Sequence, residues 1–137
     1  MSGFSDIQAT LMNAWGGVAL AYPVSYEGRD FTPPNGAPWV ELRTLPVSVK
    51  AAAIGAGAPL EHVGMLQIGL NYPLNNGTGA ALADADTVAD YFTPGTTFTH
   101  NGMRIVCESC DRSQMLRDDA WATLYLTMKW RAWQHRA

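Results

Sequence analysis

The chain has 137 residues and a net charge of −3, from 9 basic and 12 acidic side chains. This length predicts one domain over residues 1–137, and a content of 47% hydrophobic and 10% aromatic residues excludes a disordered chain. The acidic balance argues against a nucleic-acid-binding patch. Charged residues make up only 15% of the chain, against about 25% in typical soluble domains, which predicts that much of the surface contacts other protein.

The N-terminal region contains a long uncharged stretch, because residues 7–26 carry no charged side chain. Such a stretch is long enough for a membrane-spanning helix. Polar residues and Pro23 interrupt it, and its apolar residues follow one helical face, so we predict no membrane span. No basic residue precedes Arg29, and the positive region of a secretory signal is therefore missing.

A helix is predicted over residues 4–20, ended by Pro23. Ser5 and Gln8 have the spacing of a capping box at its start. The apolar residues expected to form its buried stripe recur at helical spacing; they are Ile7, Leu11, Ala14, Trp15 and Val18. Residues 24–27 are expected to form a short strand.

Alternating apolar residues predict a strand over residues 39–45 and a longer one over residues 61–72. The arm of residues 31–38 precedes the first strand, and its three prolines exclude a helix or a central strand. Residues 46–60 are rich in alanine and glycine without periodicity, and we expect a long loop there.

A second helix is predicted over residues 79–92, with Thr78 as its N-terminal cap. The residues expected on its buried face are Leu82, Ala85, Val88, Ala89 and Phe92. Three aspartates, Asp84, Asp86 and Asp90, occupy the rest of the helix surface and indicate contact with solvent.

The Asn101-Gly102 pair predicts a β-hairpin between residues 96–99 and 103–108. A polar loop is expected over residues 109–119, and a last strand begins near residue 120, followed by a short basic and aromatic tail. This order of elements predicts an α+β fold, with an antiparallel or mixed sheet and two helices packed on one face.

The candidate catalytic groups form no recognisable site. Cys107 and Cys110 make a CxxC pair, but the pair follows a strand, whereas a thioredoxin-like site requires a helix N-terminus. No second cysteine pair completes a zinc site, and His62, His100 and His135 have no neighbouring ligand in the sequence. We therefore predict no enzyme, no cofactor and no metal. A small enzyme that uses the two thiols is the alternative from a different class.

Surface residues remain as candidates for function, because aromatic and flexible apolar segments suit protein interfaces. The interface candidates are Pro33, Pro34, Trp39, Lys50, Ile54, Leu60, Trp121, Tyr125 and Trp133. Trp121 and Tyr125 are equally well explained as side chains that cover the second face of the sheet.

Several segments together resemble the tail terminator (tail completion) proteins of long-tailed bacteriophages. They are the Phe-Thr-Pro-Pro-Asn-Gly-Ala-Pro arm of residues 31–38, the Gly-Met-Leu-Gln-Ile strand of residues 64–68 and the Gly-Thr-Gly-Ala-Ala turn of residues 77–81. The resemblance covers about residues 4–130. It implies a sheet flanked by helices, and it brings no catalytic residues to this chain.

The resemblance also implies a place in the virion. Similar proteins form a hexameric ring at the head-proximal end of the tail tube, where the ring stops tube polymerisation and meets the head-completion or neck proteins. Genome DNA passes transiently through the lumen of this ring. We accordingly expect a homo-oligomer that assembles in the host cytoplasm, contacts the tail tube protein and no membrane, and uses residues 46–60 to reach a neighbouring subunit or ring.

An acidic lumen repels the phosphates of passing DNA. The candidates for lining it are Asp84, Asp86, Asp90, Asp118 and Asp119. The alternative function is that of another neck ring component, a head-closure or head–tail adaptor protein, because such proteins are also small ring subunits.

Overall fold

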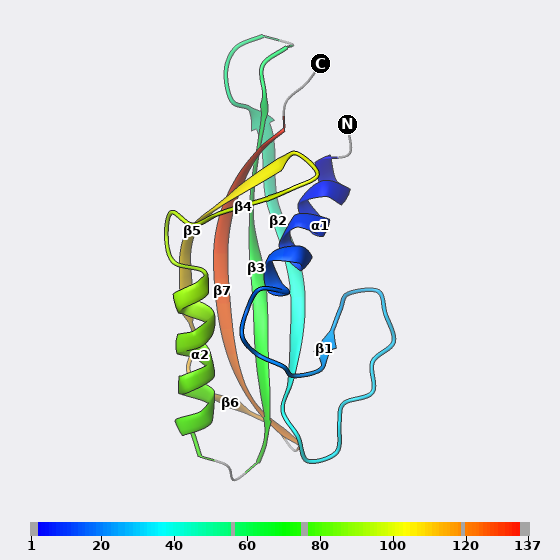
Figure 1. Ribbon diagram of the computed structural model, residues 1–137, viewed down its shortest axis with the longest axis vertical. Helices are drawn as coiled ribbons and strands as arrows, with labels where there is room; N and C mark the ends of the chain where they lie inside the picture. Colours follow the sequence, from blue (N-terminus) through cyan, green and yellow to red (C-terminus); the bar gives the residue numbers. More distant parts are fainter. Residues whose placement is uncertain (1–2, 56, 75–76, 119, 135–137) are drawn as a thin grey trace.

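The fold was obtained as a computed structural model, which describes residues 3–55, 57–74, 77–118 and 120–134. In chain order its elements are α1 (Gly3–Trp15), β1 (Val24–Ser25), β2 (Trp39–Ala51), β3 (Leu60–Pro73), α2 (Gly79–Tyr91), β4 (Thr97–His100), β5 (Met103–Arg112), β6 (Leu116–Arg117) and β7 (Trp121–Gln134). The strands form one sheet in the order β1-β2-β3-β7-β5-β4, and β6 also pairs with β7 (Figure 1). Only the β1–β2 pair is parallel among the described strands, so the sheet is mixed, as predicted.

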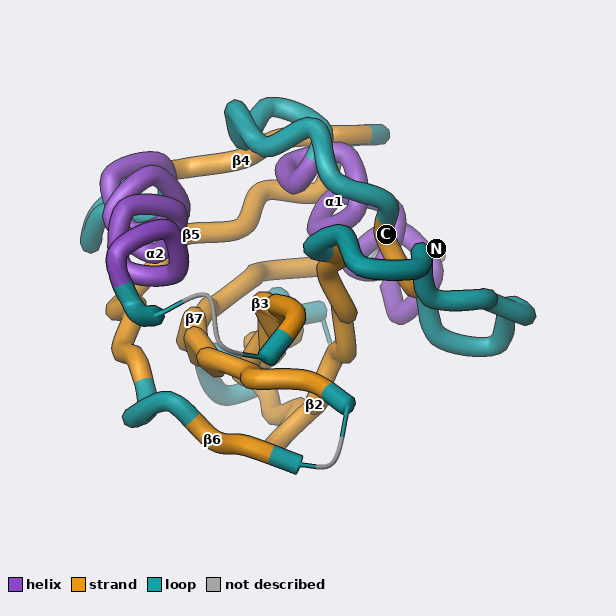
Figure 2. The backbone as a smooth tube through the Cα atoms, turned by 90° about the horizontal axis from the view of Figure 1, so that it is seen from below, coloured by secondary structure: helices purple, strands orange, loops and turns teal. Residues whose placement is uncertain are grey.

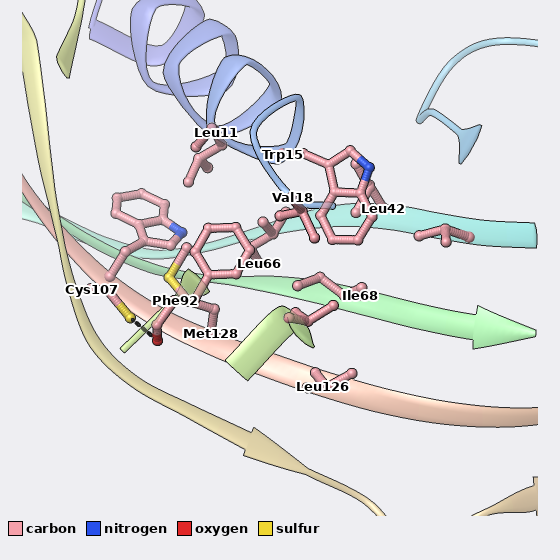
Figure 3. Packing of buried hydrophobic residues seen from close by; sticks show 14 of the residues in the cluster. Leu11, Trp15, Val18, Leu42, Leu66, Ile68, Phe92, Cys107, Leu126 and Met128 are labelled. Atoms are coloured by element: carbon pink, nitrogen blue, oxygen red, sulfur yellow. Dashed lines mark hydrogen bonds between the residues drawn. The ribbon is translucent and has the colours of Figure 1, made fainter. Parts of the chain in front are cut away.

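The sheet curls into a half-barrel, and both helices pack against it (Figure 2). Residues of α1, α2 and one face of the strands form a single buried cluster. Figure 3 shows its centre, where Leu11 and Trp15 of α1 point toward the strands and belong to the same cluster as Leu66 and Ile68 of β3. The prediction of an α+β fold with two helices is therefore confirmed.

Helix α1 ends at Trp15 and not near residue 20, because two glycines follow. Glycine is unfavourable inside a helix by about 1 kcal/mol relative to alanine. The N–H of Gly17 donates to the carbonyl of Ala14 at 3.0 Å, and the chain then turns away. The capping box was wrong as well, since the helix already includes Gly3 and Ser5 therefore lies inside it. The stripe of apolar residues was right, because all five are buried.

The predicted loop of residues 46–60 is shorter than expected, because its first part is strand. Strand β2 continues to Ala51 and β3 begins at Leu60, so only residues 52–59 connect the two. A β-bulge between Pro46 and Ser48 accommodates the proline within the ladder. The two strands thus form a long hairpin whose tip projects beyond the helices (Figure 1).

Helix α2 begins at Gly79 as predicted and ends one residue early, at Tyr91, but its buried face is rotated. Ala81, Ala85 and Val88 are buried, followed by Phe92 at the C-cap, whereas Leu82 is 39% exposed. Thr78 is the N-cap residue, although its side chain makes no capping hydrogen bond.

The predicted hairpin is confirmed, because β4 and β5 are joined by Asn101 and Gly102. Both residues have positive φ values, 52° and 77°, which a two-residue hairpin turn requires and which this residue pair tolerates best. The polar loop predicted over residues 109–119 is shorter than expected, since β5 reaches Arg112 and β6 follows. The last strand runs to Gln134, so the expected tail begins later than predicted.

Candidate functional site

An apolar groove lies between the N-terminal turns of α1 and the part of the β2–β3 hairpin that precedes its tip. Its volume is about 480 Å³. The lining residues come from α1, the segment after β1, β2, β3 and β7; they are Phe4, Ile7, Gln8, Glu27, Thr44, Pro46, Ser48, Val49, His62, Val63 and Trp130. Phe4 is 73% exposed and Val49 is 43% exposed, so two apolar side chains of this groove face solvent.

The floor of the groove depends on a glycine. A Cβ atom at Gly64 would lie 2.5 Å from Cζ2 of Trp130 and 2.9 Å from the carbonyl oxygen of Leu45. Only glycine leaves room there for the indole to lie across β3. Trp130 is consequently buried, and its ring occupies the sheet face below α1.

Two polar groups of the groove lack partners. The indole Nε1 of Trp130 and the hydroxyl of Thr44 are buried and have no hydrogen-bond partner among the described residues. By contrast, Nε2 of His62 lies 2.9 Å from Oε1 of Gln134, and its ring makes an edge contact with Phe4 at 5.7 Å. A buried donor without an acceptor costs about 1–3 kcal/mol, so the groove offers hydrogen bonds to an occupant.

The tip of the hairpin is apolar and exposed. Ile54 is wholly exposed, and the residues around it in the sequence are alanines and glycines. The N–H of Ala52 donates to the carbonyl of Pro59 at 2.8 Å, which closes the turn. Two further interface candidates, Lys50 and Leu60, lie where the tip joins the strands, and Leu60 is half-buried.

Ion pairs cross four strands on the face of the sheet opposite the helices. The guanidinium of Arg131 on β7 lies 3.1 Å from Glu61 on β3 and 2.7 Å from Glu108 on β5. Lys50 on β2 lies 3.7 Å from Glu61. The two acidic carboxylates and two basic groups balance, so this part of the outer face has no net charge. Tyr125 and Trp133, both half-buried interface candidates, lie on the same face of β7.

The remaining aromatic candidates contact one another at the other end of the sheet. Phe31 lies 5.1 Å from Trp39, and Trp39 makes an edge contact with Trp121 at 5.8 Å, measured between ring centroids. The proline-rich arm thus packs against the sheet of its own chain through the ring of Phe31. Within that arm Pro33 is exposed and Pro34 is half-buried.

Asp84 differs from the other acidic candidates because two tyrosine hydroxyls bind its carboxylate. The hydroxyls of Tyr22 and Tyr72 both donate to its Oδ2, at 2.8 and 2.7 Å. Burial first, and then the bond to Asp84, raise the pKa of Tyr72. The three side chains connect the segment after α1, β3 and α2, so this carboxylate holds the fold together.

The other acidic candidates divide between two places. Asp86 and Asp90 are exposed on α2. Asp118 is exposed after β6, where its carboxylate accepts N–H groups of Trp121 at 2.6 Å and Ala120 at 2.8 Å. These bonds, that of Trp121 first, hold the pKa of Asp118 below its ordinary value. Asp119 lies outside the described residues.

The two cysteines face the same side of β5. A bulge between Cys107 and Ser109 places Cys107 opposite Trp130 and Cys110 opposite Met128. The thiol of Cys107 donates to the carbonyl of Phe92 at 3.1 Å (Figure 3). Burial raises the pKa of each thiol to about 11, so neither is a thiolate near neutral pH. A reactive redox pair needs the opposite shift.

The comparison with protein families decides the identity. A family described as "Phage tail terminator protein" matches residues 6–130 of this chain. The chain belongs to the phage tail terminator family. Its members are structural proteins of the phage tail, and the predicted resemblance is confirmed.

Solved structures support the fold of this tail terminator family member. One solved structure, whose name states no function, aligns with a TM-score of 0.78 at 17% sequence identity, over 100% of this chain and 99% of the other. Such low identity shows the fold alone. None of the curated proteins matches the chain significantly.

Two further observations concern the described part of the tail terminator chain. No helix there is long and apolar enough to cross a membrane. The residues with assigned positions also contain no cluster of three or more side chains suited to hold a metal ion.

The sequence analysis missed the groove and the Asp84 cluster. Phe4 is a signal for the groove, because it lies three residues before Ile7 and thus extends the buried stripe of α1 beyond the core. An apolar residue on a buried stripe that is itself exposed indicates a contact outside the subunit. The contacts of Asp84 span 62 and 12 residues, and no local pattern in the sequence reveals them.

Proposed function

We propose that the protein is the subunit of a hexameric ring that caps the head-proximal end of the phage tail tube. The ring stops addition of tube protein and offers its other surface to head-completion or neck proteins. The observation that carries this proposal is the family match over residues 6–130. The exposed apolar groove and hairpin tip agree with it, because a subunit that closes a ring needs two complementary surfaces.

The test is to delete the gene in the phage that encodes it. Without a terminator, tube polymerisation has no stop, so we expect tails of uncontrolled length that do not join heads. Expression of the wild-type chain from a plasmid should restore uniform tails, as measured by electron microscopy. Tails of normal length without the protein contradict the proposal. Normal tails that fail to join heads favour a head-closure or head–tail adaptor protein.

Acidic side chains are proposed to line the lumen of this ring. Asp86, Asp90 and Asp118 carry the proposal because their carboxylates are exposed, and Asp119 is included from the sequence. Asp84 is the weakest candidate, since two tyrosines already bind its carboxylate. A like charge keeps DNA phosphates from binding during passage.

Neutralising these lumen candidates should change DNA passage without preventing assembly. In a variant with Asp86→Asn, Asp90→Asn and Asp118→Asn, we expect normal tails but slower genome release, measured by dye uptake of ejected DNA. A variant with Asp6→Asn and Asp30→Asn is the control, because these two aspartates lie in α1 and in the segment before β2 and are not lumen candidates. Unchanged release in the triple variant would show that these residues do not face the DNA.

A further inference from the structure

We propose that the tip of the β2–β3 hairpin of one copy inserts into the groove between α1 and the β2–β3 hairpin of the next copy. This inference rests on the proposed ring, and it names the two surfaces that join neighbouring subunits. The donor is Ile54 with the small residues beside it, and the acceptor is the groove that Phe4, Val49 and Trp130 line.

The exposure of both surfaces supports this pairing. Ile54 is wholly exposed at the tip, and Phe4 and Val49 are exposed apolar residues of the groove. Contact between them removes apolar surface from water on both sides, which favours association in proportion to the buried area. The residues of the tip are uncharged, so no ionic group has to be desolvated when it inserts.

The chemistry of the groove favours a polypeptide loop as its occupant. The buried Nε1–H of Trp130 has no acceptor among the described residues, and the hydroxyl of Thr44 has no partner there either. A turn inserted into the groove brings backbone carbonyl groups, which are the acceptors that both groups lack. A hydrocarbon occupant, which has no carbonyl groups, would leave the indole N–H without a hydrogen-bond acceptor.

The tip cannot fill the groove of its own chain. The groove is lined by Pro46, Val49, His62 and Val63, which belong to the paired strands of the same hairpin. The ladder between β2 and β3 continues past them to the Ala51–Leu60 pair, so the paired strands carry the tip away from the groove. Because the inserting and the receiving surfaces differ, the contact is head-to-tail, and such contacts close into a ring when the rotation between neighbouring copies closes.

Cysteine cross-linking tests the contact directly. The double variant Phe4→Cys with Ile54→Cys is examined under mild oxidation, both as concentrated purified protein and in tails from complemented cells. We expect a ladder of disulfide-linked oligomers on a non-reducing gel. Each single variant should give no ladder, and neither should Phe4→Cys combined with Leu116→Cys, which places the second thiol on exposed β6 at the other end of the sheet.

The outcomes separate this inference from the proposed function. Restored tails without a ladder in either preparation overturn the inference and leave the function standing. A ladder in purified protein, with tails that do not depend on the gene, supports the contact and contradicts the function. A second variant, Ile54→Asp, should lower oligomer formation at least about tenfold by native mass spectrometry while its unfolding midpoint stays unchanged, because Ile54 makes no core contact. Unchanged oligomers in this variant also overturn the inference.

Discussion

Replacing Phe92 with alanine is expected to lower the free energy of unfolding by about 3–5 kcal/mol, the usual loss for a buried phenylalanine. Phe92 is fully buried at the end of α2 and contacts the rings of Tyr91 and Phe98, at 5.1 and 5.4 Å between centroids. Its backbone carbonyl also accepts the thiol hydrogen of Cys107. Equilibrium unfolding in urea, followed by tryptophan fluorescence, measures the change.

Leu82→Ala on the same helix is the matched control. Leu82 is 39% exposed, so its truncation should cost less than about 1 kcal/mol. The measurement is made at low protein concentration, where contacts between copies do not contribute. A loss for Leu82→Ala as large as that for Phe92→Ala would contradict this packing, because it would show that Leu82 is buried as the sequence predicted.

The error on α2 has a physical cause. Its sequence contains alanines on several sides of the helix, so two stripes one residue apart fit the helical period almost equally well. Leu82 was placed in the core because it has helical spacing with Ala85, Ala89 and Phe92. The choice depends on β3, β5 and β7 across the interface, and no local pattern contains that information. The stripe of α1, with Ile7, Leu11 and Trp15, has no such ambiguity.

The hairpin illustrates a second limit of sequence reasoning. Pro46 and the alanines and glycines that follow in the sequence are typical of a loop, yet β2 continues through Pro46 as far as Ala51. Strand β1 pairs with β2 only at Val40 and Glu41, so the later part of β2 is an edge among the described strands. A proline is tolerated at an edge or bulge, because the missing N–H removes no necessary hydrogen bond. The alternation in residues 61–72, by contrast, was strong enough to predict strand β3 almost to the residue.

Replacing Asp84 with alanine is the second substitution that we expect to lower the free energy of unfolding strongly. The carboxylate accepts hydrogen bonds from both Tyr22 and Tyr72, and bonds to a charged group contribute about 1.5–3 kcal/mol each. Since the two bonds share one oxygen, Asp84→Ala should lower the free energy of unfolding by about 2–4 kcal/mol. Asp86→Ala, on the exposed side of the same helix, should change it by less than about 0.5 kcal/mol.

A double-mutant cycle identifies the source of this loss. If the two tyrosine hydroxyls carry it, Tyr72→Phe should cost clearly less in the Asp84→Ala background than in the wild type. Equal costs in both backgrounds would assign the loss to something other than this hydrogen bond. A large stability loss also means that any effect of Asp84 on DNA passage must be compared at equal folded fraction with that of Asp86.

The same cluster predicts how stability depends on alkaline pH. Burial raises the pKa of Tyr72 above its ordinary value of 10.0, so the native state keeps a proton that the unfolded chain releases. The stability that Tyr72 contributes is therefore fully present below pH 10 and is lost as the pH rises above it, by up to about 1.4 kcal/mol per pH unit. Unfolding in urea between pH 9 and 12 should show a shallower decline for Tyr72→Phe than for the wild type. Both proteins retain the two buried thiols, whose contribution cancels in the comparison, and parallel declines would mean that Tyr72 ionises in the native state as freely as in the unfolded chain.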